Sequence, residues 1–365
     1  MMLCMNVWTS LLKMEGGTKF EPCGGLTDRL RVLPYYVWLA HKSGRKLLIK
    51  HTKPHPLEEF FIPPEGGLDW RLPDKYCENE EEFEIYANRS WEQMTEGRSI
   101  MWHEHIDNPY WNNTRFVFVN NNLSFESMMD VFHEETGLKA DDIWPNLFRR
   151  MFKPSTALGK VIDDHANKYG LVPGAYSGAH VRARYPGEGI QEIRRKSNST
   201  QEDEVINMYD PPTRAVVNEI GENAIQCAVK LFPETRQVYF ATDTNRIIDY
   251  LLHESPIWSP QNKNETLSTR PAIIIVSRPN YNKGSLHIDT HLNFPGREGI
   301  APVDEFYQIF IDLWILSHTK CLSQGLGGFG HFASILSGNH LQCRNRHRTI
   351  EMGSTNRCPN TLEMN

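Results

Sequence analysis

The sequence lacks several features that would assign it to a large class of proteins. Its longest uninterrupted aliphatic run, residues 272–276, is far shorter than the roughly 20 apolar residues that a membrane-spanning helix needs. Positive charge is not in excess, since 39 lysines and arginines stand against 45 aspartates and glutamates. A chain with a net charge of −6 is a poor nucleic-acid binder, because duplex binding requires many cations at the phosphates. We therefore expect no nucleic-acid partner.

Signals for targeting and for common catalytic folds are also missing. Residues 1–13 contain no basic start followed by a long apolar stretch, so no secretory signal is visible. A membrane would then be reached only through an anchor that this sequence does not contain, and a chain without one would be cytoplasmic. No G-x-x-x-x-G-K-[ST] segment occurs, which disfavours P-loop kinases and NTPases, and no G-x-S-x-G segment indicates a serine hydrolase.

The seven cysteines contain no C-x-x-C pair, which argues against structural zinc. Cys343 and Cys358 lie in a polar segment and could pair with each other, whereas Cys227 and Cys321 have apolar neighbours and are predicted to be core residues. Five N-x-S/T sequons occur where about three are expected by chance, and this excess favours the secretory lumen. The sequons begin at Asn88, Asn112, Asn122, Asn198 and Asn264.

The composition that is present is globular, with 39% hydrophobic and 11% aromatic residues in a chain of 365. At about 150 residues per domain, this length predicts roughly two domains. Strands alternate with helices along the chain, which predicts an α/β fold with parallel sheets. We predict a first domain over residues 1–172 with an irregular insertion at 52–112, a second domain over 173–340, and a polar tail over 341–365.

Hydrophobic period and turn residues predict the individual elements. Apolar residues at helical spacing follow Gly24 and Gly25 and predict a helix from residue 26 to Ser43, which Pro34 should kink or delay. Further helices are predicted over 123–136, 142–152, 156–169, 214–232, 246–253, 303–317 and 329–336. Strands are predicted over 46–50, 115–120, 175–182, 237–242, 271–277 and 320–323.

Polar and charged side chains gather where the predicted strands of the second half end. In an open parallel sheet, ligands bind at the carboxyl ends of the strands. These ends carry His180, Arg182 and Arg184, then Asp243, then Ser277 and Arg278, and finally the glycine-rich residues 325–330. Arginine binds phosphate oxygens through two N–H groups, and glycines at a helix N-terminus let backbone N–H groups approach an anion. The pattern favours a nucleotide with phosphates, and the alternative is a tight turn beside solvated arginines.

Two features of this region have more than one interpretation. Gly325, Gly327 and Gly330 match G-x-G-x-x-G, but a dinucleotide enzyme needs a further strand that ends in a ribose-binding acid. Only the polar segment with Glu351 follows, so an NAD(P)-dependent oxidoreductase is the less favoured alternative. Asp312 lies in an apolar helical stretch, where a carboxylate requires a partner. That partner is either the N1–H and N2–H₂ edge of guanine, or a helix cap or salt bridge.

Metal binding is not expected. Histidines in segments 102–105 and 287–291 have spacings that a metal would accept, but with 15 histidines in the chain such clusters arise in ordinary loops. No carboxylate pair with D-x-D spacing follows a strand near the predicted phosphate site. The basic residues 194–196 are predicted to be a solvated face.

Four segments in this order resemble the GDP-fucose-dependent fucosyltransferase superfamily, which includes the α-1,6, α-1,2 and protein O-fucosyltransferases. Residues 22–30, P-C-G-G-L-T-D-R-L, resemble its G-G-L-G-D-R-L signature, and residues 179–182, A-H-V-R, resemble its H-x-R motif. Residues 239–243, Y-F-A-T-D, are similar to its A-T-D strand. Residues 312–317, D-L-W-I-L-S, with 327–330, G-G-F-G, are similar to its D-L-x-x-L-S segment and donor loop.

The resemblance implies a GT-B fold, with two Rossmann-like domains facing a cleft and GDP held mainly by the second. It implies metal-independent, inverting transfer of fucose from GDP-fucose to a hydroxyl of a glycan or protein, with no cofactor because the GDP-sugar is a substrate. Arg182 would bind the β-phosphate, Asp312 would bind guanine, and Glu188 or Glu192 is a candidate base. The implied donor-binding set is Gly25, Leu26, Thr27, Asp28, Arg29, His180, Arg182, Asp243, Asp312, Gly327, Gly328, Phe329 and Gly330.

The chain also departs from the family pattern. Thr27 replaces a glycine, Ala183 stands where the α-1,6 enzymes have a second arginine, and Gly327 and Gly328 stand where hydroxyl residues are usual. These departures leave a non-catalytic nucleotide- or glycan-binding member of the same fold as the alternative function. Together with the sequons, the resemblance favours the lumen of the Golgi or endoplasmic reticulum.

Overall fold

A computed structural model of the chain describes residues 2–6, 26–51, 55–72, 116–120, 125–182, 214–243, 245–258, 272–275, 302–325, 327–338, 343–346 and 358. The chain forms two compact units. The first comprises Met1–Val161 and Ile288–Tyr307, and the second comprises Ile162–His287 and Gln308–Asn365. The contacts divide the chain within helix α8 (Thr156–Tyr169), whereas we predicted a boundary after residue 172.

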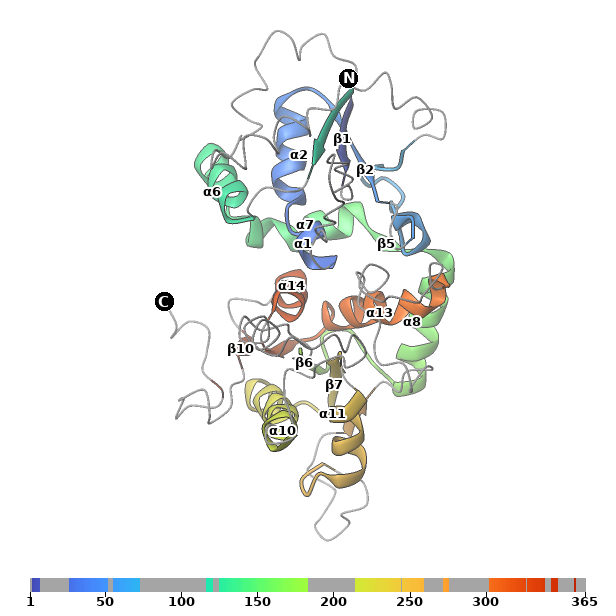
Figure 1. Ribbon diagram of the computed structural model, residues 1–365, viewed down its shortest axis with the longest axis vertical. Helices are drawn as coiled ribbons and strands as arrows, with labels where there is room; N and C mark the ends of the chain where they lie inside the picture. Colours follow the sequence, from blue (N-terminus) through green and yellow to red (C-terminus); the bar gives the residue numbers. More distant parts are fainter. Residues whose placement is uncertain are drawn as a thin grey trace, which may run out of the picture. The chain divides into compact units, whose positions relative to one another are not determined.

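The first unit contains a three-stranded parallel sheet in the order β2-β1-β4. Its central strand β1 (Met2–Asn6) pairs with β2 (Lys46–Lys50) on one side and with β4 (Phe116–Asn120) on the other. We did not predict β1 from the sequence, because a five-residue apolar segment at the start of the chain shows no period and no preceding turn signal. Helix α2 (Leu33–Lys42) contacts β1 and β2 (Figure 1).

The predicted effect of Pro34 on the first helix is confirmed. The segment forms two helices, α1 (Leu26–Leu30) and then α2, and the proline occupies the first turn of α2. A proline is tolerated there because the N–H that it lacks has no partner within the helix. Gly44 follows with φ of 62°, the left-handed conformation that commonly ends a helix, and β2 begins two residues later.

The rest of the first unit surrounds an aromatic core. The rings of Phe61, Phe148 and Phe152 pack on one another, and the Trp70 indole nitrogen donates a hydrogen bond to the Met151 carbonyl at 2.6 Å. The predicted irregular insertion is therefore wrong for part of its length, since residues 55–72 contain short regular elements and core side chains. The remaining elements are η1 (Leu57–Glu59), β3 (Phe61–Ile62), α6 (Phe125–Thr136), α7 (Ala140–Met151), β5 (Lys153–Pro154) and η7 (Val303–Phe306).

The second unit contains a five-stranded parallel sheet in the order β10-β9-β6-β7-β8. The strands are β6 (Ser177–Val181), β7 (Gln237–Thr242), β8 (Ala272–Ile275), β9 (Cys321–Gln324) and β10 (Arg344–Arg346). The helical elements are α10 (Arg214–Leu231), α11 (Asn245–Asp249), η5 (Tyr250–Glu254), α13 (Tyr307–Leu316) and α14 (Gly328–Leu336). The predicted elements of this half are confirmed to within a few residues at their ends. β10 is an additional strand.

Side chains on opposite faces of this sheet pack against different helices. Ala179 and Val181 of β6 belong to one apolar cluster with residues of α10 and α11. Gly178 faces the other way, since a Cβ atom built on it would lie 2.9 Å from Leu316 of α13. Figure 1 shows the same arrangement, with α10 and the pair α13 and α14 on opposite sides of β6 and β7. None of the helices that the structure describes is long and apolar enough to cross a bilayer.

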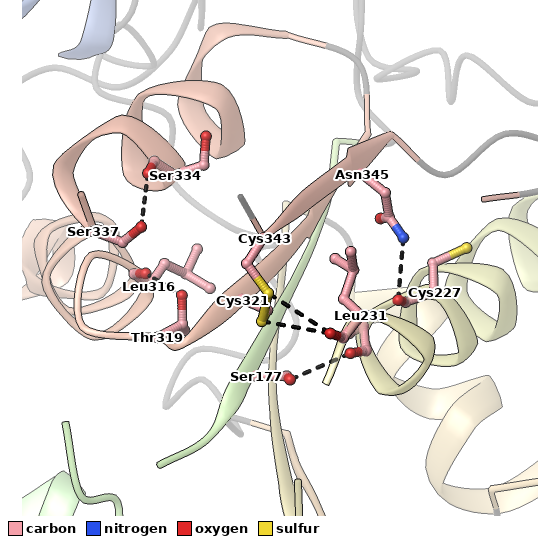
Figure 2. The surroundings of a disulfide bond; sticks show 11 residues. Ser177, Cys227, Leu231, Leu316, Thr319, Cys321, Ser334, Ser337, Cys343 and Asn345 are labelled. Carbon is pink, nitrogen blue, oxygen red and sulfur yellow. Dashed lines mark hydrogen bonds between the residues drawn. A yellow bond between two sulfur atoms is a disulfide. The ribbon is translucent and has the colours of Figure 1, made fainter. Parts of the chain in front are cut away.

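Two disulfides attach the C-terminal segment to this unit. One disulfide joins Cys227 to Cys358. The other joins Cys321 to Cys343 and is drawn in Figure 2. The predicted pairing of Cys343 with Cys358 is wrong, because β10 places Cys343 beside Cys321 on the neighbouring strand. The predicted polar tail is wrong at residues 344–346, which form the edge strand β10. The burial of Cys227 and Cys321 is confirmed.

Candidate functional site

The described residues among those predicted at the strand ends lie where the parallel strands of the second unit end, whereas Arg184, Ser277 and Arg278 are outside the described part of the chain. β6 is the middle strand, and His180 pairs in register with Ala241 of β7 on one side and with Gln324 of β9 on the other. Arg182, Asp243 and Gly325 therefore follow three adjacent strands. The connection from β6 leads to β7 on one side of the sheet. The connection from β9 leads to β10 on the other side, so the strand order reverses between β6 and β9. In open α/β sheets such a reversal of strand order marks the crevice in which ligands bind.

Arg182 lies across the turn that precedes α14. A Cβ atom built on Gly327 would lie 2.9 Å from Arg182 Cδ and 3.1 Å from Nη1, so a larger residue there would displace the guanidinium from this position. Gly327 also has φ of 90°, which side-chain-bearing residues rarely adopt. Because Gly327 is the N-cap of α14, the arginine lies beside backbone N–H groups at the start of a helix. A guanidinium and helix N–H groups together form a site for an anion such as a diphosphate.

His180 is enclosed by the same turn. A Cβ atom built on Gly330 would lie 2.8 Å from His180 Nδ1, so the first turn of α14 packs directly on the imidazole. The Phe329 ring lies 5.1 Å from the imidazole, centroid to centroid, at an angle of 32°. The Gly325 N–H donates to the His180 carbonyl at 3.0 Å, which fixes the start of the turn to β6. His180 is 6% exposed and therefore lies at the base of the site.

The glycine turn thus has a function that the sequence did not indicate. We predicted that its glycines bring backbone N–H groups close to an anion, and the structure shows that Gly327 and Gly330 make room for two side chains of the neighbouring strand. The prediction that only a polar segment follows this turn is also wrong, because β10 completes a β9–α14–β10 unit. β10 ends in Arg346, however, where NAD-binding proteins need an acid to bind the ribose hydroxyls. Glu351 lies outside the described residues.

Asp312 is buried on α13 and has partners within the protein. Its Oδ1 atom accepts hydrogen bonds from the Tyr239 hydroxyl at 2.6 Å and from the Gln308 side-chain amide at 2.7 Å. Two donors offset much of the cost of burying a carboxylate that is only 5% exposed. Neither donor is the helix cap or the arginine that we considered. Tyr239 was missed as a polar contact because it lies in the middle of an otherwise apolar strand.

The first-unit residues of the predicted donor set are only partly described. Leu26, Thr27 and Arg29 are buried, while Gly25 and the side chain of Asp28 lie outside the described part. Arg29 is 1% exposed, and its Nη1 atom lies 3.2 Å from His51 Nε2. Since His51 Nδ1 lies 3.1 Å from the His55 carbonyl, Nδ1 carries the proton and Nε2 accepts from the arginine.

This contact requires a neutral imidazole. Burial and the positive charge of Arg29 lower the pKa of His51 to about 3. A neutral histidine can therefore accept a hydrogen bond from a buried arginine across the physiological pH range. His51 was not predicted, because a single histidine after a strand gives no signal in the sequence.

Several predicted residues lie in segments that the structure does not describe. These are Glu188, Glu192, the basic residues 194–196, the histidine segments 102–105 and 287–291, and the asparagines of all five sequons. Among the described residues, no group of three or more histidines, cysteines or carboxylates is arranged to hold a metal ion. The catalytic base and the metal independence both stay predictions.

Comparisons with known proteins identify the fold. The structure of FUT1 from Arabidopsis thaliana, a mutant fucosyltransferase in complex with GDP, superposes with a TM-score of 0.51 at 13% identity, over 98% of this chain and 73% of that one. The fucosyltransferase NodZ from Bradyrhizobium gives a TM-score of 0.42 at 13% identity, over 88% and 91% of the two chains. No family model matches the sequence. No curated protein matches it either. The likeness to FUT1 confirms the predicted α/β fold of GT-B type.

Proposed function

We propose that this chain is a glycosyltransferase that transfers fucose from GDP-fucose to a hydroxyl group of a glycan or protein. The observation that carries the proposal is the position of Arg182. Its side chain lies against Gly327 at the N-terminus of α14, where the order of the strands in the sheet reverses. The fold likeness to a fucosyltransferase solved with GDP supports this interpretation, as does the order of the four sequence motifs.

The proposed chemistry depends on charge that develops on the leaving group. When the bond from fucose to the β-phosphate breaks, negative charge accumulates on GDP. The Arg182 guanidinium and the N–H groups of Gly328 and Phe329 would stabilise that charge from fixed positions. Donors that are already in place need no reorganisation during the reaction. The close packing of Gly327 and Gly330 on Arg182 and His180 would hold the donors in this way.

Other residues have proposed supporting roles. Asp312 would bind guanine, Asp243 would line the same edge of the sheet, and Glu188 would deprotonate the acceptor hydroxyl. Gly25, Leu26, Thr27 and Asp28 of the first unit are further proposed donor-binding residues, whereas the burial of Arg29 against His51 favours a structural role for that residue. The reaction would use neither a metal nor a separate cofactor, because Arg182 and the helix N-terminus would take the place of a divalent cation at the diphosphate.

The proposed location is the lumen of the secretory pathway. Disulfides persist in oxidising compartments and are rare in the cytosol, so the pairs Cys227–Cys358 and Cys321–Cys343 support this proposal. The five N-x-S/T sequons support it as well.

The direct test is donor turnover by the full chain. Purified protein is incubated with labelled GDP-fucose and an array of glycans and folded protein domains, with and without excess EDTA. We expect fucose to appear on one acceptor class at the same rate in both conditions. A strict requirement for Mn²⁺ or Mg²⁺ would contradict the proposed role of Arg182.

The alternative is a protein of the same fold that binds the nucleotide without catalysis. Gly327 and Gly328, which stand where the family has hydroxyl residues, favour this alternative because two side-chain donors to the phosphate are missing. GDP binding by calorimetry, without transfer to any acceptor and without donor hydrolysis, would identify it.

A further inference from the structure

A covalent ring encloses the segment that carries the glycine turn. Cys321 is the first residue of β9, and Cys343 directly precedes β10. Their disulfide joins residues 22 apart in sequence, and the chain between them contains β9, the glycine turn and α14. The disulfide therefore joins the two ends of the segment that packs on Arg182 and His180. It lies where β9 and β10 begin, and the glycine turn lies where β9 ends.

The disulfide is packed against a helix on the other face of the sheet. The sulfur atoms of Cys321 and Cys343 lie 3.7 and 3.6 Å from the carbonyl oxygen of Leu231, the last residue of α10 (Figure 2). The Leu322 N–H donates to the Cys343 carbonyl at 3.1 Å, so the bridge and the first hydrogen bond between β9 and β10 reinforce each other. The bridge thus ties β9 and β10 together where both begin.

β10 transmits this constraint to α14. Arg344 Nη1 lies 3.4 Å from Ser334 Oγ and 3.4 Å from His331 Nε2, and both partners are on α14. Asn345 anchors the same strand on α10 by donating to the Cys227 carbonyl at 3.1 Å. A strand of only three residues is weakly held by its own ladder. The covalent bond at its start adds to the ladder with β9 and to the Asn345 contact in holding Arg344 against α14.

We propose that the Cys321–Cys343 disulfide is a positioning element for the donor site. By holding β10 against α14, it keeps Gly327 and Gly330 at the distances that seat Arg182 and His180. The inference rests on the proposed function as far as GDP binding is concerned. The second disulfide attaches Cys358 to Cys227 in the C-terminal half of α10, and neither cysteine lies within the segment from Cys321 to Cys343. The contact of Cys227 with β10 is made by its backbone carbonyl, which an alanine would retain. This disulfide stabilises the unit without fixing α14, which makes it a matched control.

The test compares two double variants of the full chain, Cys321→Ala with Cys343→Ala, and Cys227→Ala with Cys358→Ala. Both should lower the Tm by several degrees, because each removes one disulfide. Only the first should raise the Kd for GDP, by about tenfold, since it removes the preorganisation of the site. Only the first should also speed hydrogen exchange of the α14 amides. Equal changes in both double variants, or an unchanged Kd in the first, would overturn the proposal.

Two further measurements keep the outcomes distinct. If the first alanine pair does not fold, a valine pair at Cys321 and Cys343 fills more of the volume, and the same expectations apply. If the wild-type chain does not bind GDP, the proposed function fails. Hydrogen exchange of α14 then decides the inference alone, and unchanged protection in the Cys321–Cys343 variant would overturn it.

Discussion

Two arginines in the two units show how differently the same side chain can be used. Arg29 of α1 is 1% exposed and contacts the neutral ring of His51, whereas Arg182 is half-buried at a strand end and lies across a glycine. The sequence motifs give both arginines a place in the donor site. Their surroundings separate them, because Arg29 belongs to the core of its unit and Arg182 lies at the edge where a ligand would bind.

The contrast concerns what holds each cation in place. His51 supplies an acceptor to Arg29, and this arrangement stabilises the local fold without requiring a ligand. Arg182 lies against Gly327 at the start of a helix, and backbone N–H groups at such a position are suited to bind an anion. Changes at the first site should therefore alter stability, and changes at the second should alter binding and turnover.

The largest effect is expected at Arg182. Arg182→Lys keeps the charge and loses the two-pronged contact with a diphosphate. Turnover of GDP-fucose should fall roughly a hundredfold, about 2.7 kcal/mol, with little change in Tm. The matched control is Arg29→Lys, which should lower the free energy of unfolding by about 1–3 kcal/mol because a buried hydrogen bond is lost. Near-normal turnover in Arg182→Lys would remove the distinction between the two arginines.

A second prediction uses pH to test the first unit. Because the folded pKa of His51 is about 3 and the unfolded value is near 6.5, the unfolded chain binds more protons between these values. Stability should therefore fall as the pH drops below about 6.5, by up to about 1.4 kcal/mol per pH unit, or about 2 kcal/mol by pH 5. Denaturant unfolding of wild type and His51→Gln over this range measures the effect. An equal pH slope in both proteins would show that His51 is not the group responsible.

Asp312 allows the same separation of binding from folding in the second unit. Asp312→Asn retains an oxygen that can accept from Tyr239 and Gln308, so stability should change little. Its amide group would oppose the guanine N–H donors, and GDP affinity should fall about thirtyfold, or about 2 kcal/mol. Titration with GDP, ADP and UDP measures the change. Unchanged GDP affinity in the variant, or equal wild-type affinity for GDP and ADP, would leave Asp312 with its role between β7 and α13 alone.

These contrasts also explain what could be predicted from the sequence. The parallel sheet of the second unit followed from hydrophobic period, and the positions of Arg182, Asp243 and the glycine turn followed from where its strands end. Strand order could not be predicted in this way, because it depends on which strands pair across long sequence separations. The pairing of β9 with β10 is the reason that Cys343 joins Cys321 rather than Cys358.

Side-chain contacts were the least predictable part of the site. The hydrogen bond from Tyr239 to Asp312 joins residues 73 apart, and the contact of Arg29 with His51 joins residues 22 apart. The Arg182 motif and the glycine motif could each be recognised from the sequence, but the close contact of Gly327 with the Arg182 side chain could not. This contact depends on the space between the residue after β6 and the turn after β9, and no period or residue spacing in the sequence indicates it.

The smallest expected effect tests whether this space matters. In Gly330→Ala, the new Cβ atom would lie 2.8 Å from His180 Nδ1 and 3.1 Å from Gln324 Cβ, so the enclosed imidazole would have to shift. Overpacking costs about 1–3 kcal/mol, and the gain in helix propensity returns up to about 1 kcal/mol, so we expect a net loss of about 1 kcal/mol. GDP affinity should fall about threefold to fivefold, because His180 and Arg182 are close in sequence and both contact the same turn.

Gly159→Ala in α8 is the control, since a Cβ atom there makes only an ordinary 3.6 Å contact with Pro154. This variant should gain about 0.5–1 kcal/mol in its free energy of unfolding. Calorimetric titration and denaturant unfolding of both variants measure these changes. If Gly330→Ala bound GDP as tightly as Gly159→Ala, the close packing of α14 on His180 would contribute to the fold and not to ligand binding. The contact of Gly327 with Arg182 would then be the part of the turn that affects the ligand.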